Sequence, residues 1–225
     1  MIIAENVSKK FMDSDREIWP VNKLSINVES GRFFSIVGRS GSGKSTLLKI
    51  LGGLLEPTDG KVVIDGKDIY SLSRNEIADY RNQVIGFVFQ DYFLEEMYTV
   101  YQNVEIALMI AGVDKKDRAQ RVEAALEAVE LGDKKSSLVK NLSGGEKQRV
   151  SIARAIVNNA SIIFADEPCG NLDWENSQNV MRLLRKQCDA GKTVVLITHS
   201  LDDAKLTDEI ITLKDGSIIE HEKLR

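Results

Sequence analysis

The chain has 225 residues, which is enough for one large domain or for one domain with a sizeable insert. Apolar residues make up 43% of it and charged residues 28%, so we expect a globular protein with a substantial core and a well-solvated surface. The formal net charge of −4 and the isoelectric point of about 5.4 argue against nucleic acid as the main partner, because phosphate binding favours a basic face.

Two further features of the composition bear on where the chain works. Its two cysteines, Cys169 and Cys188, are too few for a disulfide framework, which indicates a reducing compartment. The first residues carry an acid at Glu5 and lack a long apolar stretch, so we expect no signal peptide. No stretch approaches about eighteen uninterrupted apolar residues, so we expect any work at a membrane to go through a partner protein.

Short strands are expected in the first third of the chain. Residues 24–28 alternate apolar and polar side chains, as a half-buried strand does. Residues 33–37 form a short, mostly apolar run that meets glycines, which is typical of a strand buried on both faces. Residues 61–64 are expected to form a strand that enters a tight turn at Asp65 and Gly66.

Buried strands that alternate with helices are expected in the rest of the chain. Three runs, 84–89, 162–165 and 193–197, share the apolar character of 33–37. Two segments between them have the three- and four-residue apolar spacing of amphipathic helices. The first is 115–131, with Ala119, Val122, Leu126 and Val129 on one face, and the second is 175–190, with Val180, Leu183, Leu184 and Cys188, followed by Gly191 as a C-cap. This alternation predicts a parallel α/β sheet, with the mostly helical residues 91–157 as an insert.

The strongest motif is the glycine-rich segment 38–46, which matches G-x-x-x-x-G-K-[ST] between an expected buried strand and a helix expected over 46–54. Glycines let the backbone fold around an anion, and the following helix adds the positive end of its dipole. Lys44 would supply charge to the β- and γ-phosphates, and Ser45 a hydroxyl to magnesium. The alternative is a glycine-rich turn with a chance lysine. The motif predicts a site for ATP and Mg²⁺ made by Gly38, Arg39, Ser40, Gly41, Ser42, Gly43, Lys44, Ser45 and Thr46.

Two adjacent acids, Asp166 and Glu167, follow the expected strand 162–165. The carboxyl ends of parallel strands are where α/β proteins bind their ligands. We expect Asp166 to hold the magnesium shell and Glu167 to polarise the attacking water as a general base. Alone, the pair would be interpreted as a solvated strand end, but the phosphate-loop motif favours the functional interpretation.

The chain has two histidines, and His199 directly follows an expected buried strand and Thr198. From there it could reach a γ-phosphate or the attacking water. A lone histidine is more often a hydrogen-bonded structural residue, and residues 200–203 resemble a helix start, so both interpretations stay open. His221, near the C-terminus, is interpreted as an ordinary surface residue.

Residues 142–148 read Leu-Ser-Gly-Gly-Glu-Lys-Gln. Ser143 and Glu146 have the spacing of a capping box in front of a helix expected over 147–157. Gly144 and Gly145 would weaken a helix, but they would let an anion approach its N-terminus closely. The segment is therefore either a well-capped helix start or a second phosphate-binding helix start.

These motifs, in this order, resemble the ATP-binding-cassette (ABC) ATPases, and the resemblance covers essentially the whole chain. It implies a P-loop NTPase (RecA-like) α/β core with an antiparallel β subdomain and an inserted α-helical subdomain. It further implies one domain over 1–225, with its core in 1–90 and 158–225 and the helical subdomain in 91–157.

The resemblance also implies roles for individual residues. Gln90, directly after the strand expected at 84–89, would link magnesium to the helical subdomain, and Asp173 would lie in the D-loop. His199 would be the switch histidine. Phe11 would stack on adenine, where the family commonly has tyrosine. The implied metal ligands are Ser45, Gln90 and Asp166, and the implied catalytic residues are Lys44, Gln90, Glu167 and His199.

A second copy of the chain is an implied partner, because nucleotide domains of this family dimerise head to tail. Residues 38–46 of one copy would hold the ATP. The segment that would close over its γ-phosphate from the other copy consists of Ser143, Gly144, Gly145 and Glu146. Two ATP sites per homodimer would result, each built from both chains.

Residues 87–90, 166–168 and 170–173 look most like the group of macrolide exporters, lipoprotein-release ATPases, antimicrobial-peptide-resistance transporters and the cell-division ATPase. This implies an ATP-hydrolysing subunit at the cytoplasmic face of the membrane that powers a separate permease, as an exporter or a mechanotransmission system for peptides, drugs or lipoproteins. One alternative is a cell-division-type ATPase that regulates a membrane partner without transport. Another is a soluble ATPase acting on DNA or ribosomes, which the single cassette and the acidic balance disfavour.

Two details add expectations to the resemblance. The aromatic-rich residues 91–104 are expected to dock a cytoplasmic helix of the permease, and the alternative is that their rings belong to the core. Cys169 stands where a threonine is usual in the family, which raises the question of sensitivity to oxidation.

Overall fold

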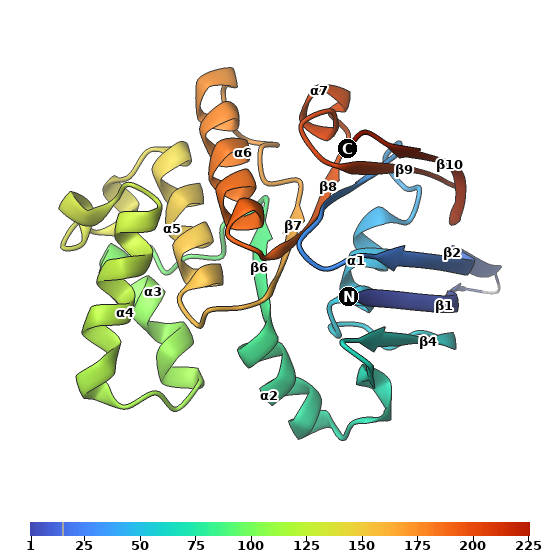
Figure 1. Cartoon of the computed structure of the whole chain (residues 1–225), viewed down its shortest axis with the longest axis horizontal. Coiled ribbons are helices and arrows are strands. Elements are labelled where there is room, and N and C mark those ends of the chain that lie inside the picture. The colour runs from blue at the N-terminus through green and yellow to red at the C-terminus, as the bar shows by residue number, and fades with distance from the viewer. Residues whose placement is uncertain (15) are drawn as a thin grey trace.

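Two β-sheets and the helices around them make up the described residues, 1–14 and 16–225, of this computed structural model (Figure 1). The larger sheet has six strands in the order β10-β9-β3-β8-β7-β6. Neighbours are parallel from β9 to β6, and β10 is antiparallel to β9. The strands are β3 (Phe33–Val37), β6 (Ile85–Phe89), β7 (Ile162–Asp166), β8 (Thr193–Thr198), β9 (Glu209–Lys214) and β10 (Ser217–Lys223).

The parallel part of this sheet decides where the functional motifs meet. All four runs that the sequence predicted as buried strands lie in it as neighbours: β3, β8, β7 and β6. The carboxyl ends of parallel neighbours lie at one edge of a sheet. The segments that follow these strands, which begin at Gly38, Gln90, Glu167 and His199, are therefore brought to the same edge.

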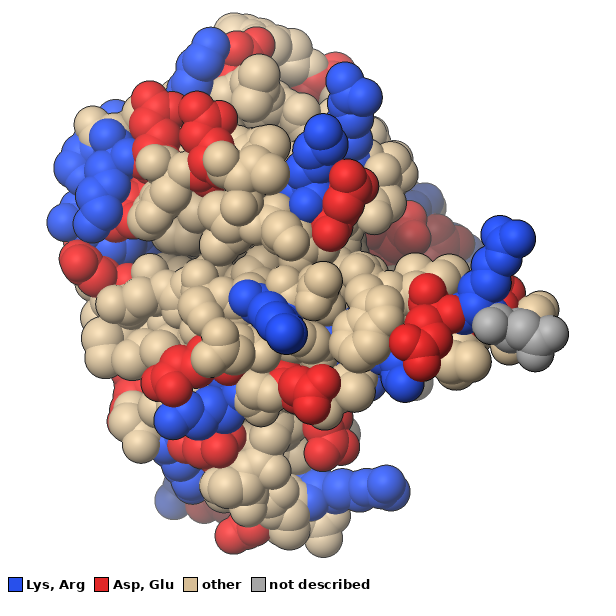
Figure 2. All heavy atoms as spheres, turned by 90° about the vertical axis from the view of Figure 1, so that its right-hand side faces the viewer, with Lys and Arg blue, Asp and Glu red and all other residues tan. Residues whose placement is uncertain are grey.

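The smaller sheet is the predicted antiparallel subdomain. Its order is β2-β1-β4-β5, with β1 (Ile2–Asp13), β2 (Arg16–Val28), β4 (Asp59–Ile64) and β5 (Lys67–Asp68). The expected turn is present between β4 and β5, where Asp65 and Gly66 both have positive φ, 48° and 83°. On the face that carries this sheet, lysines and arginines are interspersed with acids (Figure 2).

The helices cover both faces of the larger sheet. They are α1 (Lys44–Leu51), α2 (Arg74–Val84), α3 (Val100–Ile110), α4 (Lys115–Ala128), α5 (Gly144–Ile156), α6 (Trp174–Asp189) and α7 (Leu201–Ala204), with short 3-10 turns at Ile69–Ser71, Gly132–Lys134 and Val139–Asn141. The helices α3, α4 and α5 lie within the expected insert and gather at the left of Figure 1. None of the helices in the described part of the chain has the length and apolar character to cross a bilayer.

Several predicted helix boundaries and faces need correction. The helix expected from Thr46 begins at Lys44, and the helix expected from Lys147 begins at Gly144, because in both cases the loop motif itself forms the first turn. Burial along α4 starts at Val122, so the prediction that Ala119 belongs to the buried face is wrong. In α6 the predicted apolar face is buried, and Gly191 follows the C-cap with φ 92°.

The core consists of one apolar layer on each face of the six-stranded sheet, because successive strand residues point to opposite faces. On one side Phe33, Ile163 and Leu196 pack with the helices α3 to α6. On the other side Phe34 and Phe164 pack with α1 and the smaller sheet. The first layer contains side chains from both the helical insert and the six-stranded sheet, so the insert packs directly against the sheet.

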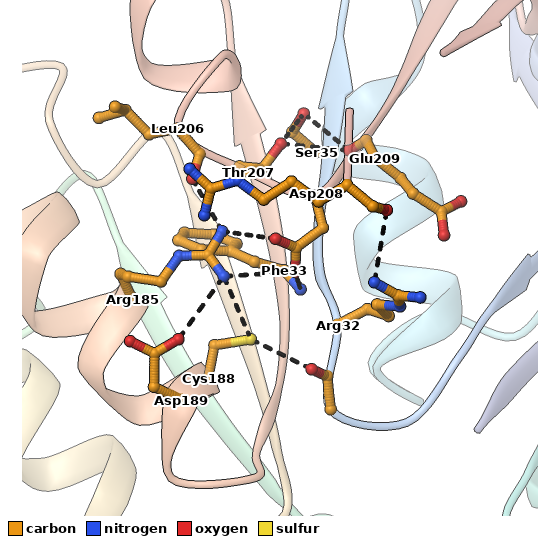
Figure 3. Close-up of polar contacts among 12 residues, drawn as sticks. Arg32, Phe33, Ser35, Arg185, Cys188, Asp189, Leu206, Thr207, Asp208 and Glu209 are labelled. Atoms are coloured by element: carbon orange, nitrogen blue, oxygen red, sulfur yellow. Dashed lines mark hydrogen bonds and ion pairs between the residues drawn. The ribbon is translucent and has the colours of Figure 1, made fainter. Parts of the chain in front are cut away.

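An ion pair fastens α6 to this sheet (Figure 3). The guanidinium of Arg185 contacts the Asp208 carboxylate at 2.9 and 3.3 Å and lies over the Phe33 ring, 4.9 Å from its centroid. The same carboxylate accepts a hydrogen bond from the Phe33 N–H at 2.8 Å. One buried carboxylate thus ties α6 to the starts of both β3 and β9.

Candidate functional site

The loop between β3 and α1 is shaped to hold an anion. Gly41 and Gly43 have positive φ, 79° and 100°, which glycine adopts at little cost. A Cβ on Gly43 would lie 1.8 Å from the carbonyl oxygen of Pro20, so no larger residue fits between this loop and β2. Lys44 Nζ donates to the carbonyl oxygens of Gly38 and Arg39, at 2.8 and 3.1 Å. Its ammonium therefore lies at the mouth of the loop, where a phosphate would replace these acceptors.

A pocket of about 660 Å³ opens beside this loop and brings four of the predicted motifs together. From the loop itself, Ser40, Gly41, Gly43, Lys44, Ser45 and Thr46 line it. Its other walls are Pro20, Gln90, Glu167 and His199. A volume of this size is within the range of small-molecule sites and suits a nucleotide.

The hydroxyl of Ser45 donates to Oδ1 of Asp166 at 3.1 Å, so two of the three predicted magnesium ligands are neighbours. Burial raises the pKa of Asp166, and the hydrogen bond from Ser45 opposes that shift. Within residues 1–14 and 16–225, no group of three or more His, Cys, Asp or Glu side chains is placed to hold a metal ion. One carboxylate, one hydroxyl and the amide of Gln90 nevertheless fit Mg²⁺, which usually takes one or two carboxylates, with phosphate and water oxygens completing its shell.

Glu167 lies at the turn after β7 in an uncommon backbone conformation. Its φ is 48°, in the left-handed region that non-glycine residues seldom adopt. Its N–H donates to the Ile197 carbonyl at 2.9 Å, which keeps this turn against the end of β8. Strain of this kind is often found at functional sites, and here it directs a carboxylate into the pocket.

His199 holds that carboxylate from the next strand. Its Nδ1 lies 2.8 Å from Oε2 of Glu167, and its backbone N–H donates to the same oxygen at 3.3 Å. His199 is thus hydrogen-bonded, as expected of a structural residue. It also lines the pocket, as expected of a residue that could reach a γ-phosphate or the attacking water. The predicted helix start behind it is present, with Ser200 as the N-cap of α7.

Gln90 faces the segment that precedes α6. Its Nε2 donates to Oδ1 of Asn171 at 3.2 Å, and Asn171 Nδ2 donates back to the Gln90 carbonyl at 3.4 Å. A Cβ on Gly170 would lie 2.9 Å from the same amide nitrogen, so a larger residue there would displace the end of the Gln90 side chain. Asn171 and Pro20 are contacts that the sequence interpretation did not single out. Asn171 stands inside a motif that was recognised, whereas only the folded structure brings Pro20 to the loop.

The start of α5 is the predicted capping box. Ser143 Oγ accepts from the Glu146 N–H at 3.3 Å, and the Glu146 carboxylate accepts from the Ser143 N–H at 2.8 Å. Gly145 is buried, and a Cβ there would lie 2.0 Å from Oδ1 of Asn176 on α6. Close packing of two helices therefore explains Gly145 within one chain, without the anion that the sequence interpretation invoked. Gly144 is exposed and stays open to a ligand.

Several predicted residues lie outside the pocket of their own chain. Residues 143–146 do not line it, and neither does Phe11, which is exposed on β1 beneath Lys9. Asp173 caps α6 by accepting from the Asn176 N–H at 2.8 Å, a hydrogen bond that also lowers the pKa of Asp173. Burial raises the pKa of the Cys169 thiol to about 12, which disfavours its reactive thiolate form.

Comparisons with known proteins show the family to which the chain belongs. A family model described as ABC transporter matches residues 21–170. The chain is 42% identical over 220 residues to the ABC transporter ATP-binding protein MJ1508 of Methanocaldococcus jannaschii, with 98% of both proteins covered. The chain belongs to the ABC transporter family. The cassette is also 42% identical over 219 residues to the macrolide export ATP-binding/permease protein MacB of Brucella melitensis biotype 1. That match covers 97% of the cassette and 34% of MacB, so the cassette spans about a third of that relative.

A solved structure confirms the predicted fold class. The ATP-binding cassette MJ0796, described as dimeric and bound to ADP and Pi in a post-hydrolysis state, matches with a TM-score of 0.92 and 39% identity. The match covers 100% of the cassette and 99% of that chain. The P-loop α/β core, the antiparallel β subdomain and the helical subdomain are therefore those of an ABC ATPase. The predicted resemblance to the ABC ATPases of the macrolide-exporter group is confirmed.

Proposed function

We propose that this cassette binds ATP with Mg²⁺ in the pocket beside residues 38–46 and hydrolyses it only as a homodimer. The observation that carries the proposal is the convergence of Lys44, Gln90, Glu167 and His199 on one pocket. Lys44 would neutralise the phosphates, while Ser45 and Asp166 with Gln90 would hold the metal. When bound, Mg²⁺ would neutralise charge that develops on the transferred phosphoryl group.

Hydrolysis would be carried by the pair Glu167 and His199. Oε2 of Glu167 would take the proton of the attacking water, since a carboxylate directed into a pocket can act as a general base. His199 would keep that carboxylate in place through its two contacts, at 2.8 and 3.3 Å. Phe11 would stack on adenine at the rim of the site, where its ring is exposed.

The second half of the site would come from a second copy of the chain. In the structure, the signature segment 143–146 lies outside the pocket that contains Lys44, although Ser143 and Gly144 are exposed. A helix N-terminus with free N–H groups suits a γ-phosphate, so this exposed start of α5 fits the nucleotide of a partner. The dimeric form described for MJ0796 supports a head-to-tail pair of this kind.

The work of the dimer would be to move a membrane permease from the cytoplasmic face, for the export of peptides, drugs or lipoproteins. Exposed side chains within residues 91–104 support a docking surface: Phe93 is 67% exposed, Met97 64% and Tyr98 45%. These side chains are not core residues. Phe89 and Arg154, which both contact Phe93, line a hollow of about 220 Å³ between β6, α2, α3 and α5, on the boundary of the proposed core (1–90 and 158–225) and helical subdomain (91–157).

The alternative is a cell-division-type ATPase that signals to a membrane partner without transporting a substrate. Relatives such as MacB, in whose name export is stated, favour the exporter. Lys44→Ala tests the site that both alternatives share, because it removes the charge at the loop mouth. A fluorescent ATP analogue should lose its binding to this variant, while Lys205→Ala, an exposed lysine on the segment after α7, should bind as the unchanged chain does. Unchanged affinity in the Lys44 variant would contradict the proposal.

A further inference from the structure

The turn between β9 and β10 packs against the phosphate loop, residues 38–46. It consists of Asp215 and Gly216, with φ 48° and 76°. Gly216 is buried, although Asp215 beside it is exposed. The N–H of Gly216 donates to the carbonyl oxygen of Ser42 at 3.2 Å, and the carbonyl of Gly216 accepts from the Asn22 N–H at 3.0 Å. One residue of the turn is therefore hydrogen-bonded both to the phosphate loop and to β2.

A carbonyl group of β2 forms a second link between the turn and the loop. A Cβ on Gly216 would lie 2.9 Å from the Trp19 carbonyl oxygen and 3.0 Å from that of Pro20. A Cβ on Gly43 would lie 1.8 Å from the same Pro20 oxygen. The Pro20 carbonyl is thus in close contact with both glycines, and as a backbone group it cannot rotate away. A side chain at position 216 would therefore press the Pro20 carbonyl against Gly43, at the start of α1.

The strand before this turn contacts the other end of the phosphate loop. A Cβ on Gly38, the first residue of the loop, would lie 2.3 Å from the carbonyl oxygen of Leu213 on β9. The β9–β10 hairpin thus contacts the loop at Gly38 and Ser42. None of residues 209–223, all of which the structure describes, lines the nucleotide pocket. The hairpin therefore supports the loop without forming a wall of the pocket.

The chain contains a second turn of the same sequence and conformation. Asp65 and Gly66, between β4 and β5, have φ 48° and 83°. Gly66 is exposed, and a Cβ there would meet no atom within 4 Å. An Asp-Gly turn of this kind thus needs no packing around its glycine. The close contacts of Gly216 come from its place beside the phosphate loop and not from the turn itself.

Building on the proposed function, we infer that Gly216 is a positioning residue for ATP: the β9–β10 turn holds residues 38–46 in the conformation that binds phosphates. The N–H groups of such a loop must converge on the anion, so a small shift of Ser42 or Gly43 weakens binding. Coupling between two sites is reciprocal, so a nucleotide in the loop also stabilises the contact between Ser42 and Gly216.

The first test compares the two turns. Gly216→Ala and Gly66→Ala both place a Cβ at a positive φ, so both carry the same backbone cost. Only Gly216→Ala also adds a Cβ against Pro20. At a temperature where thermal unfolding shows both variants folded, Gly216→Ala should bind a fluorescent ATP analogue about 10-fold more weakly than the unchanged chain. Gly66→Ala should bind it as the unchanged chain does.

The second test uses the unchanged chain, so its result does not depend on whether Gly216→Ala folds. MgADP fills the phosphate loop without the γ-phosphate that the proposed dimer contacts. In amide hydrogen exchange followed by NMR, MgADP should slow the exchange of the Gly216 N–H at least about 5-fold. The control is the Asp65 N–H, which donates to the Met1 carbonyl at 2.9 Å in the other turn and should exchange at an unchanged rate.

Equal ATP affinities of Gly216→Ala and Gly66→Ala would overturn this inference and leave the proposed function standing. So would equal slowing of the Gly216 and Asp65 amides, because the nucleotide would then stabilise the whole fold and not the contact with the turn. An unchanged chain that binds neither the ATP analogue nor MgADP would overturn the proposed function and this inference together.

Discussion

The carboxylate of Glu167 lies 2.8 Å from Nδ1 of His199 and 3.3 Å from its backbone N–H. Glu167 comes from the end of β7 and His199 from the end of β8, which are parallel neighbours in the larger sheet. The φ of 48° at Glu167 turns its side chain toward this histidine. The neighbouring ends of β7 and β8 and the backbone turn at Glu167 together orient the carboxylate of the proposed general base.

His199→Ala should therefore lower the turnover of ATP by about 100-fold, because a general base that is no longer oriented loses most of its effect. Nucleotide affinity should change far less than turnover, as Lys44 and the loop are untouched. His221→Ala is the matched control, since His221 contacts Glu209 at 3.0 Å on β10, away from the pocket. Steady-state kinetics that show equal turnover for the two variants would remove His199 from the mechanism.

Ser143→Arg should abolish ATP-dependent dimerisation and lower turnover by at least about 100-fold, because a long cation would occupy the exposed start of α5. Binding of a fluorescent ATP analogue to the monomer should be unchanged. The substitution also removes a helix cap, which costs about 1 kcal/mol of stability. Ser73→Arg controls for that loss, because Ser73 forms the same capping box with Glu76 at the start of α2. If both variants dimerise equally, the site is not completed in trans.

Asp208→Asn should destabilise the fold by about 3 kcal/mol at neutral pH, because it leaves the Arg185 guanidinium beside a neutral group in a half-buried position. Chemical denaturation is the measurement. Asp189→Asn is the control, since Asp189 is 66% exposed and 3.8 Å from Arg185, and it should cost less than about 0.5 kcal/mol. Equal losses in the two variants would contradict the role given to Asp208.

The same pair sets a pH dependence. Burial would raise the pKa of Asp208, but hydrogen bonds from Arg185 and the Phe33 N–H, with the charges of Arg185 and Arg225, lower it overall. A lowered folded pKa gives stability that is fully present above the unfolded value, about 3.9, and is lost as pH falls through the folded value. The difference in unfolding free energy between the unchanged chain and Asp208→Asn should therefore be constant down to about pH 5 and shrink below about pH 4.

Much of the site could be predicted from sequence because its motifs are local. The loop with Lys44, the acids Asp166 and Glu167 and His199 each stand at or directly after the end of a strand that its apolar composition predicts. The parallel pairing of these strands then brings the three motifs together. The capping box of α2, Ser73 with Glu76, carried the same kind of local signal and was overlooked. The strand β10 has no such local sequence pattern, because most of its residues are polar and exposed at the edge of the sheet.

Other features depend on residues that are distant in sequence. The packing of Gly145 against Asn176 and of Gly43 against Pro20 exists only once the elements are placed, so a glycine needed for close approach was interpreted as one kept open for an anion. The contacts of Asp208 also form only in the folded chain, because its partners Phe33 and Arg185 lie on β3 and α6. Local sequence patterns predict helices, strands and loop motifs, whereas these packing contacts depend on how the helices and sheets are arranged in the folded chain.

The central claim is that ATP binding needs one chain while hydrolysis needs two. The most direct measurement is the mass of Glu167→Gln in solution by size-exclusion chromatography with light scattering, with and without MgATP, next to its turnover. We predict a monomer without nucleotide, a stable dimer with ATP, and turnover reduced by at least about 100-fold. A variant that stays monomeric with ATP bound and hydrolyses it at the unchanged rate would contradict the account.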